Sequence, residues 1–412
     1  MDAIITQKNT ILQIFDVTPI QTQKKISWPE HLAQAITSLP ELVTQLGLPN
    51  HLVQQGATAH QSFKLLVPRP YLSRMEYGNP NDPLLLQVLP SAMEMQKVAG
   101  YTKDPLEEAD HNPQKAIVHK YKRRLLVITT GTCAVNCRYC FRRHFPYGDN
   151  QLAQAEWQSV IDYLQRHPEV NEVILSGGDP LMMKDALLAD KVRKLEALPQ
   201  IKRLRIHSRL PVVIPARVCD DMLAWITASR LDIVMVWHIN HANEVDEEVS
   251  QAARKLKSAG VTLLNQAVLL KGVNDSVEAL VQLSEAVFSA GLLPYYLFTL
   301  DPVEGAAHFD IRIEEAQHLM WKVAAELPGY WVPRRANEMP GHPAKTGLAP
   351  ILSPHSTESA QVVRQARPVG ARLSWAPAGT SPRCDPSAAA AHGYAVPRRH
   401  WRPDVSARRA PE

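Results

Sequence analysis

What this sequence lacks already excludes several classes of protein. A membrane-spanning helix needs about 20 consecutive apolar residues, and no stretch among the 412 residues approaches that length. The N-terminal run MDAIITQKNT has no basic segment followed by an apolar core, so it does not indicate a signal peptide. A large excess of one charge is also missing, because the formal net charge is only +4, and this gives no argument for nucleic-acid binding. We therefore expect a cytoplasmic protein that binds neither a membrane nor a nucleic acid.

Cysteine is scarce, and its distribution is uneven. The five cysteines are an odd number. Three of them, Cys133, Cys137 and Cys140, stand together in the run CAVNCRYCF. This distribution argues against the disulfide framework of a small secreted protein and favours metal-bound thiolates in a reducing compartment.

The spacing C-x3-C-x2-C leaves two kinds of metal centre open. Clustered thiolates bind soft metals, and a structural zinc ion usually takes four ligands in two pairs. Here the fourth ligand would have to be Cys219, Cys384 or a histidine, and none of these forms a second pair. The alternative is a cubic iron–sulfur cluster, in which three thiolates hold three irons and the fourth iron stays open to a small ligand. The close triplet, with Tyr139 and Phe141 beside its last cysteine, favours the cluster.

Lysine is absent from the last part of the chain, 347–412, which is rich in alanine, proline and arginine. This part shows no convincing helical or strand periodicity, so its composition predicts a disordered tail. The abrupt change also raises a second hypothesis, a shift of reading frame near residue 347, which resequencing of the coding DNA would decide. At the other end, residues 1–118 predict a helical, loop-rich region, in which Ser27 and Glu30 mark the start of one helix.

Between these parts, short apolar runs alternate with longer amphipathic ones. The apolar runs predict six buried strands, at 125–130, 172–176, 203–207, 232–239, 262–270 and 294–300. The amphipathic segments predict six helices, near 152–166, 182–196, 217–229, 244–258, 276–290 and 312–326. Helical crossovers keep successive strands parallel, so we expect an α/β fold, a parallel barrel or a partial barrel, over residues 119–346.

Polar and glycine-rich groups follow the first four predicted strands. They are Gly131 to Cys140, Ser176-Gly177-Gly178-Asp179, His207-Ser208-Arg209 and His238-Ile239-Asn240. In parallel barrels the chemistry gathers at the carboxyl ends of the strands, so these groups predict one site. Each group alone is weak evidence, because a GGDP run is a common turn and a histidine at a strand end is more often a hydrogen-bonded core residue than a ligand.

The cysteine run resembles the signature of the radical S-adenosylmethionine (SAM) superfamily. The resemblance implies a partial parallel (β/α)6 barrel, in which the three cysteines hold a [4Fe–4S] cluster. It also implies that the open iron binds the amino and carboxylate groups of SAM, and that one electron from the cluster cleaves SAM to a 5′-deoxyadenosyl radical. Ser176, Gly177, Gly178 and Asp179 look like the superfamily's GGE-type motif, which contacts the amino group of SAM.

A longer part of the chain, 66–346, is similar to the lysine 2,3-aminomutase family, and most closely to its shorter branch, which modifies elongation factor P. The matching stretches include LLVPRPYLSRMEYGNPNDPLLLQVLP, HKYKRRLLVITTGTCAVNCRYCFRRHFPYG, VILSGGDPL, HINHANEV and PYYLFTLDPVEGAAHF. The resemblance implies an isomerase that uses SAM and pyridoxal phosphate (PLP) to convert L-lysine to (R)-β-lysine. It further implies a reductase or flavodoxin-type electron donor and a ligase that attaches the product to elongation factor P, and it allows a homo-oligomer.

The same resemblance assigns roles to individual residues. Lys345 would form the Schiff base with PLP, and Arg124 would bind the PLP phosphate. Arg142 would pair with the substrate carboxylate, for which a planar guanidinium offers two-point contact. Asp301 and Glu338 would bind the substrate ε-ammonium. The positions assigned to SAM are His238, Asn240 and Gln266, and those near SAM or PLP also include His207, Ser208 and Arg209.

Some alternatives stay open at this point. Glu338 stands where lysine aminomutases carry an aspartate, so the substrate geometry can differ. Outside the family context, Lys345 would be a solvated lysine in a proline-rich loop, and Asp301 would be an ordinary turn residue. The other functions to consider are a stand-alone catabolic lysine or glutamate 2,3-aminomutase, a radical SAM enzyme that modifies RNA or protein without PLP, and a folded but inactive binding protein.

Overall fold

The computed structural model describes residues 26–146, 156–338, 342 and 345–347. The prediction of a disordered tail and the frame-shift hypothesis concern residues that, from 348 onwards, lie outside this part of the chain. Within the described ranges, no helix combines the length and the apolar character that a membrane crossing requires.

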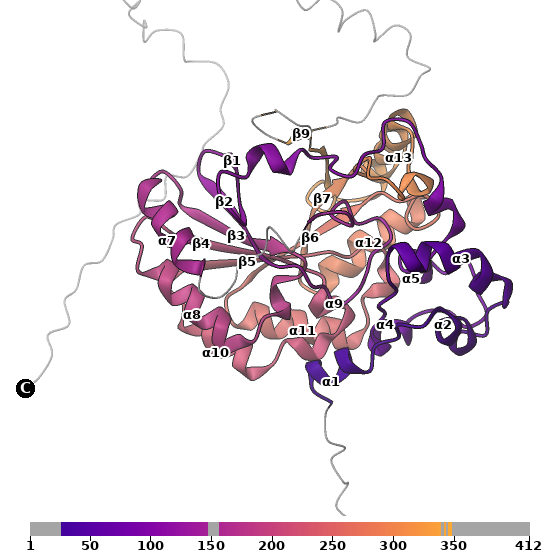
Figure 1. Cartoon of the computed structure of the whole chain (residues 1–412), viewed down its shortest axis with the longest axis horizontal. Helices are drawn as coiled ribbons and strands as arrows, with labels where there is room; N and C mark the ends of the chain where they lie inside the picture. The colour runs from indigo at the N-terminus through magenta and orange to yellow at the C-terminus, as the bar shows by residue number, and fades with distance from the viewer. Residues whose placement is uncertain (1–25, 147–155, 339–341, 343–344, 348–412) are drawn as a thin grey trace, which may run out of the picture. The chain divides into compact units, whose positions relative to one another are not determined.

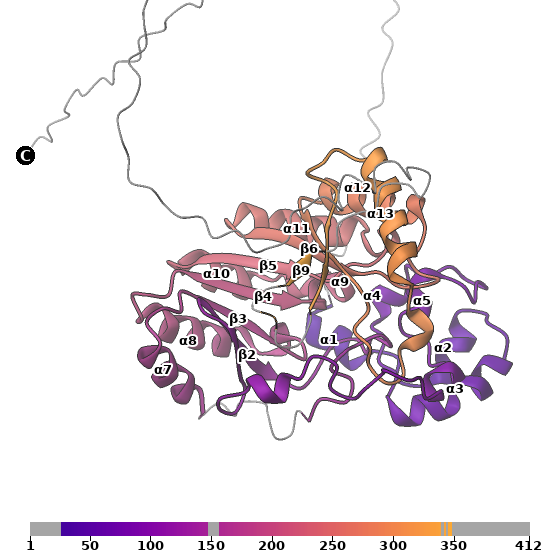
Figure 2. The ribbon, with the colours of Figure 1, turned by 90° about the horizontal axis from the view of Figure 1, so that it is seen from above.

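The described residues form a nine-stranded sheet in which the strands neighbour one another in sequence order (Figures 1 and 2). The strands are β1 (Ile117–Tyr121), β2 (Arg124–Thr130), β3 (Glu172–Gly177), β4 (Arg203–Ser208), β5 (Asp232–Trp237), β6 (Thr262–Val268), β7 (Leu293–Phe298), β8 (Arg334–Asn337) and β9 (Thr346–Gly347). Strands β2 to β8 are parallel, and β1 and β9 pair antiparallel with the two ends of this series. Sequential parallel pairing with a twisted sheet gives a partial barrel.

Helices connect the parallel strands and cover the outer side of the curved sheet (Figures 1 and 2). The longer ones are α7 (Trp157–Arg166), α8 (Asp185–Glu196), α10 (Asp220–Ala228), α11 (Glu247–Ser258), α12 (Val277–Ser289) and α13 (Ile313–Glu326). Short helices near the strand ends are η4 (Pro180–Met182), α9 (Leu210–Val213), η5 (Pro215–Arg217), η6 (Ala242–Glu244) and η7 (Ala307–Phe309). In α8, for example, Leu188, Val192 and Leu195 are buried, while Arg193 and Lys194 are exposed, as expected of an amphipathic helix packed on a sheet.

The predicted strands correspond to β2–β7, and the predicted helices correspond to the six longer ones, apart from the start of the first, which lies outside the described residues. Strand β8 adds a seventh parallel strand to the six that the sequence predicts. Its sequence is Arg-Arg-Ala-Asn, which contains no apolar run, and one of its arginines, Arg335, is buried and donates a hydrogen bond to the backbone oxygen of Ile313 at 3.3 Å. The edge strands β1 and β9 are also absent from the prediction.

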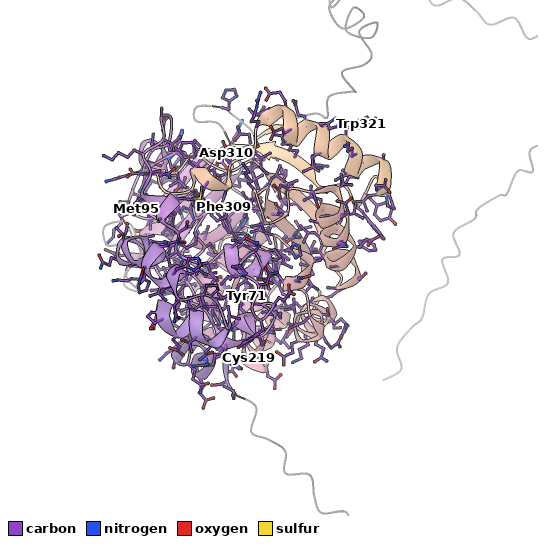
Figure 3. All side chains as sticks on the ribbon, turned by 90° about the vertical axis from the view of Figure 1, so that its right-hand side faces the viewer. Tyr71, Met95, Cys219, Phe309, Asp310 and Trp321 are labelled. Carbon is purple, nitrogen blue, oxygen red and sulfur yellow. The ribbon has the colours of Figure 1, made fainter. Side chains whose placement is uncertain are left out.

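Short helices of the N-terminal region gather beside the barrel (Figure 1). They are α1 (Trp28–Ala33), α2 (Leu39–Gln45), α3 (His51–Ser62), α4 (Arg69–Leu72), α5 (Pro83–Leu86), η1 (Ala92–Met95) and η2 (Glu108–His111). The predicted start of α1 is confirmed, because the backbone N–H of Ser27 donates to Glu30 Oε2 at 2.8 Å. Figure 3 views this side, where η1, which contains Met95, contacts η7, which contains Phe309.

Residues of the N-terminal region also contact the loop that carries the three cysteines. Arg138 forms a buried ion pair with Glu94, and Arg143 donates to the same carboxylate at 2.8 Å. Arg138 reaches further, since its Nη1 donates to the backbone oxygen of Phe63 at 2.7 Å and its backbone N–H donates to the backbone oxygen of Gln87 at 2.9 Å. Removing one partner of a buried ion pair typically costs about 3–5 kcal/mol. These contacts therefore fix the cysteine loop against the N-terminal helices.

Candidate functional site

A cavity of about 510 Å³ lies inside the partial barrel. Side chains alternate between the two faces of a strand, and the inward-facing positions line this cavity, as Arg124 and Leu126 of β2 and Glu172, Ile174 and Ser176 of β3 show. The loops that follow the carboxyl ends of the strands add further lining residues. The cavity is therefore bounded both by the interior of the barrel and by its carboxyl end.

Nearly all the residues that the sequence assigns to a site meet in this cavity. The lining includes Arg124, Cys133, Cys137, Cys140, Arg142, Ser176, Gly177, Gly178, Asp179, His207, Ser208, Arg209, His238, Gln266, Asp301, Glu338 and Lys345. The exception is Asn240, which is buried but is not part of the lining. Residues from seven consecutive strand ends are thus brought to one place, as a parallel barrel predicts.

The three cysteines face the cavity in a poorly solvated environment. Burial raises the pKa of Cys133 well above its ordinary value. Burial, together with the nearby sulfur of Cys137, raises the pKa of Cys140 to about 11. Thiols of this kind stay protonated at neutral pH unless a cationic centre stands beside them. Iron would supply that charge, so this donor set fits an iron–sulfur cluster.

The arrangement also bears on the zinc alternative. Among the residues that the structure describes, no three His, Cys, Asp or Glu side chains lie close enough together to hold one metal ion. A zinc ion needs its ligands gathered around a single point, whereas a cubic cluster takes its thiolates at separate corners. The described residues therefore give the zinc alternative no support.

Gly177 and Gly178 bring the end of β3 against the cysteine loop. Gly177 has a φ of +118°, and a Cβ atom added to Gly178 would lie 2.3 Å from the backbone oxygen of Thr132. The backbone N–H groups of Gly178 and Asp179 donate to the backbone oxygens of Thr130 and Thr132, at 2.7 and 2.8 Å respectively. Only glycine permits this approach, so the two glycines position the loop that begins with Cys133.

The carboxylate of Asp179 is already used inside the protein. Its oxygens accept hydrogen bonds from Ser208 Oγ at 2.8 Å and from the backbone N–H groups of Arg209, Leu210 and Leu181, at 2.8, 2.9 and 3.0 Å. A buried carboxylate with both oxygens occupied has little capacity left for the ammonium of a ligand. The structure therefore shows Asp179 joining the ends of β3 and β4, and its expected contact with SAM stays a prediction.

Asn240 has a similar structural role. Its side-chain amide donates to Gln87 Oε1 at 2.9 Å and to the Tyr139 hydroxyl at 2.6 Å, and its side-chain oxygen accepts from the backbone N–H of Val268 at 2.8 Å. These contacts occupy its polar atoms and the residue does not line the cavity, and its expected contact with SAM stays a prediction.

His207 and His238 face the cavity as neutral side chains. Their rings meet edge to face, with centroids 5.8 Å apart. Burial, together with the positive charges of Arg209 and Arg142, lowers the pKa of His238 to about 4, and burial lowers the pKa of His207 well below its ordinary value. Each Nε2 is buried with no hydrogen-bond partner among the described residues. Buried polar atoms normally have a partner, so this part of the cavity fits a polar ligand such as SAM.

Lys345 meets two acidic residues in the cavity. Its ammonium forms an ion pair with Glu338 and lies 4.6 Å from the centre of the Phe298 ring. Lys120 Nζ stands 3.7 Å from the other oxygen of Glu338. Burial alone would raise the pKa of Glu338, but the charges of Lys345 and Lys120 hold it below its ordinary value. Glu338 is therefore ionised at neutral pH.

Asp301 is the second acid, and it behaves differently. Burial, together with the negative charge of Glu338, raises the pKa of Asp301 to about 7, although Lys345 opposes this shift. At neutral pH the carboxyl group is thus divided between its neutral and its ionised form. An ammonium group placed beside it would favour the ionised form, so Asp301 and Glu338 together offer a site for a cationic ligand.

Arg124 lies in an aromatic part of the lining. Its guanidinium carbon is 3.8 Å from the centre of the Tyr121 ring. Tyr295 and Tyr296, whose ring centres are 3.9 Å apart, belong to the same cavity. A guanidinium among aromatic rings fits a planar ligand that carries a phosphate, such as PLP.

Arg142 is held by a residue that the sequence analysis does not identify. Its Nε and Nη2 donate to the two oxygens of Glu108, at 2.8 and 2.6 Å, and its Nη1 donates to Ser176 Oγ at 3.1 Å. Both members of this ion pair are buried. Glu108 therefore fixes the plane of the guanidinium and occupies its Nε–Nη2 edge, and the expected two-point contact of Arg142 with the substrate carboxylate stays a prediction.

Comparisons with known proteins agree with this geometry. Residues 127–284 match the family model of the radical SAM superfamily. Over 333 residues, the chain is 49% identical to the L-lysine 2,3-aminomutase of Escherichia coli (strain K12), with 81% of this chain and 97% of that protein covered. The chain belongs to the lysine 2,3-aminomutase family.

Two further relatives show how the chain compares with the members of this family in length. The L-lysine 2,3-aminomutase of Haemophilus influenzae is 47% identical over 335 residues, which cover 81% of this chain and 99% of that protein. The L-lysine 2,3-aminomutase of Clostridium subterminale is 32% identical over 327 residues, which cover 78% of each chain. The chain therefore spans almost the full length of the first two aminomutases and about four fifths of the clostridial one.

Sequence reasoning misses several residues that shape the site in this aminomutase family member. They are Glu108, Lys120, Tyr121, Tyr295 and Tyr296, all of which line the cavity. Charge and ring type give little signal by themselves, because such residues are common on surfaces. The inward register of β1, β2 and β7 is the signal that could have identified Tyr121 and Tyr296.

Proposed function

We propose that the protein is an L-lysine 2,3-aminomutase that works with a [4Fe–4S] cluster, SAM and PLP. The observation that carries the proposal is one cavity in which three cysteines, an arginine for a carboxylate, a lysine and two acids meet. Membership of the lysine 2,3-aminomutase family supports the same reaction. The cluster and SAM supply a radical and PLP supplies electron delocalisation, while the chain binds, orients and shields the reactants.

The residues divide this task among them. The three cysteines would hold the cluster, and His238 and Gln266 would contact SAM, with His207 close by. Arg124 would bind the PLP phosphate, and Arg142 would bind the substrate carboxylate. All these groups line one cavity, and the cofactors and the substrate would displace water from it when they bind.

The contact between Lys345 and Glu338 indicates how lysine would be recognised. Inside the cavity, Glu338 forms an ion pair with the ammonium group of Lys345. When Lys345 is bonded to PLP it no longer carries this ammonium, and Glu338 and Asp301 are then available to the ε-ammonium of the substrate. Two acids at this point attract lysine and repel the side-chain carboxylate of glutamate.

Substrate choice tests the proposal. The anaerobically reconstituted protein, supplied with SAM, PLP and reductant, is offered equal concentrations of L-lysine and L-glutamate, and the β-amino acids are identified by mass spectrometry. We expect β-lysine and no β-glutamate. Formation of β-glutamate would favour the glutamate aminomutase, and the absence of both products would contradict the proposal.

The pH dependence of lysine use follows from Asp301. The pKa of about 7 belongs to the state in which the Lys345 ammonium stands near Asp301, and loss of that ammonium on bonding to PLP raises this pKa further, so the carboxyl group is mostly neutral below pH 7. Because only the ionised form pairs with the ammonium, kcat/KM should fall about tenfold for each pH unit below the pKa and level off above it. An Asp301→Asn variant should have a lower kcat/KM, and its kcat/KM should not show this fall at low pH. A profile of the original protein that is flat from about pH 6 to about pH 8 would exclude this role for Asp301.

We further propose the biological setting that the shorter branch of the family implies. The product would be (R)-β-lysine, and a partner ligase would attach it to elongation factor P. A reductase or a flavodoxin-type protein would deliver the electron in the cytoplasm. The higher identity to the first two relatives, 49% and 47% against 32% for the clostridial aminomutase, supports the same branch as those two proteins.

A further inference from the structure

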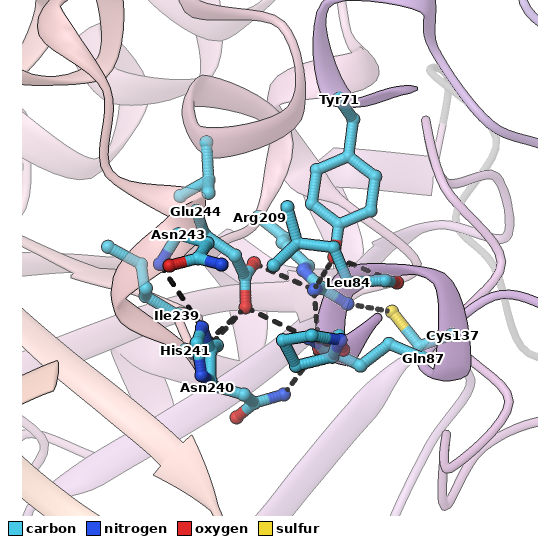
Figure 4. A network of polar contacts seen from close by, with 12 residues as sticks. Tyr71, Leu84, Gln87, Cys137, Arg209, Ile239, Asn240, His241, Asn243 and Glu244 are labelled. Atoms are coloured by element: carbon cyan, nitrogen blue, oxygen red, sulfur yellow. Dashed lines mark hydrogen bonds and ion pairs between the residues drawn. The ribbon is translucent and has the colours of Figure 1, made fainter. Parts of the chain in front are cut away.

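Arg209, which directly follows β4, is the centre of a buried polar network (Figure 4). Its Nη1 donates to Cys137 Sγ at 2.8 Å and to the Tyr139 hydroxyl at 2.8 Å. Its Nη2 donates to Glu244 Oε2 at 2.8 Å, to Gln87 Oε1 at 2.7 Å and to the Tyr71 hydroxyl at 3.0 Å. One end of the guanidinium therefore faces a cysteine of the triplet, and the other end is fixed by the protein.

The partners of Arg209 are themselves held in place. Glu244 is fully buried, and its Oε1 accepts from the backbone N–H of Asn240 at 2.9 Å and from Gln87 Nε2 at 3.2 Å. The backbone oxygen of Gln87 accepts from the N–H of Arg138, the residue after Cys137, at 2.9 Å. Gln87, which belongs to the N-terminal region, thus contacts Arg209 through its side chain and the cysteine loop through its backbone.

A cationic donor beside a cluster thiolate has a known electronic effect. Hydrogen bonds to the sulfurs are one of the factors that set the reduction potential of an iron–sulfur cluster. Reduction adds negative charge to the cluster and its thiolates, so a positive N–H donor stabilises the reduced form more than the oxidised form. Glu244 opposes this effect because it brings a negative charge to the same network.

We propose that Arg209 is a positioning residue that orients Cys137 and raises the reduction potential of the cluster bound there, with Glu244, Gln87 and Tyr71 holding it in place. The inference rests on the proposed function only in assuming that the triplet binds a cluster. It gives the N-terminal region a role in tuning the cluster, because Tyr71 and Gln87 both come from that region.

The test is a redox titration followed by electron paramagnetic resonance, on the full chain reconstituted anaerobically without lysine or PLP. The variants are Arg209→Gln, Arg209→Lys and Glu244→Gln. In R209Q we expect a more negative midpoint potential. The equilibrium constant for the one-electron reduction of the cluster should fall about tenfold, which corresponds to a shift of about 59 mV. R209K should lie between R209Q and the original protein, and E244Q should shift in the positive direction.

A matched control is Arg217→Gln. Arg217 is equally buried and is paired in two-point fashion with Asp185, at 2.9 and 3.0 Å, but it does not line the cavity. We expect this variant to lose thermal stability and to keep the original midpoint potential. A purely structural role for Arg209 would make R209Q resemble this control.

The outcomes separate this inference from the proposed function. An unchanged potential in R209Q, or shifts of the same sign in R209Q and E244Q, would overturn the inference and leave the proposed function intact. If R209Q takes up no iron, the midpoint potential of E244Q decides the inference by itself: a positive shift supports it, and a negative shift or no shift overturns it. If the original protein takes up no cluster, the proposed function itself fails.

Discussion

Replacement of Cys137 by alanine is expected to abolish the formation of β-lysine and to lower the iron content of the reconstituted protein. With one of the three thiolates removed, the cluster loses a corner ligand, and no described side chain is placed to replace it. The loss should exceed the roughly 10–100-fold that changes in outer-shell partners of a metal site produce. Iron and sulfide analysis, the visible absorption of the cluster and the product assay measure it.

Cys219 offers the matched control for this substitution. Its sulfur lies outside the cavity lining, near Asp185 Oδ2 at 3.6 Å. A Cys219→Ala variant should therefore keep both iron content and turnover. Retained iron and turnover in the Cys137 variant would remove the assigned role of the triplet.

Replacement of Lys345 by alanine is expected to abolish turnover and to remove covalently attached PLP. Lys345 and Lys120 both contact Glu338 in the cavity that Arg124 also lines, and Lys345 is the one that lies against the Phe298 ring. Borohydride reduction of the PLP-loaded protein, followed by peptide mass spectrometry, should locate the pyridoxyl group on Lys345 and on no peptide of the alanine variant.

Lys191 provides a demanding control for this trapping experiment. It is a buried lysine above the Trp157 ring, at 4.2 Å, and burial lowers its pKa to about 8. Reactivity alone would therefore favour Lys191, since its amine loses its proton more readily, whereas the cavity favours Lys345. Labelling of Lys191 in place of Lys345, or equal labelling of the Lys345→Ala variant, would contradict the assignment.

The central strands could be predicted from the sequence because burial on both faces makes them continuous apolar runs. The runs at 125–130 and 232–239 match β2 and β5 closely. The sequence RRAN of β8 carries no such pattern, because this strand is short and begins with two arginines, of which Arg335 is buried. Strand β1 lies at an edge and shows buried residues only at its start.

The site could be predicted where chemistry restricts the residue type. Cysteines at a fixed spacing and glycines at a strand end carry their own signal, and the structure brings both to the cavity. Partners from distant parts of the chain carry little signal, as Gln87 and Arg209 show at a separation of 122 residues. One trace of this network is visible in the sequence, because Gln87 is a lone polar residue within the run LLLQVL. A buried glutamine in such a run needs polar partners.

The same reasoning explains why the internal contacts of Asp179 and Asn240 could not be predicted. A motif gives the residue type and its strand end, but it does not say which of its polar atoms the protein itself uses. In both residues those atoms are taken by neighbouring groups. Their contribution is to hold the strand ends at which the other site residues stand.

The central claim is that one cavity combines a cluster, SAM, PLP and lysine for one reaction. It is tested most directly by an omission experiment with the intact, reconstituted protein. The account predicts β-lysine from the complete mixture of SAM, PLP, reductant and L-lysine, and none when SAM, PLP or reductant is left out. No β-lysine from the complete mixture, or an equal yield without PLP, would contradict it.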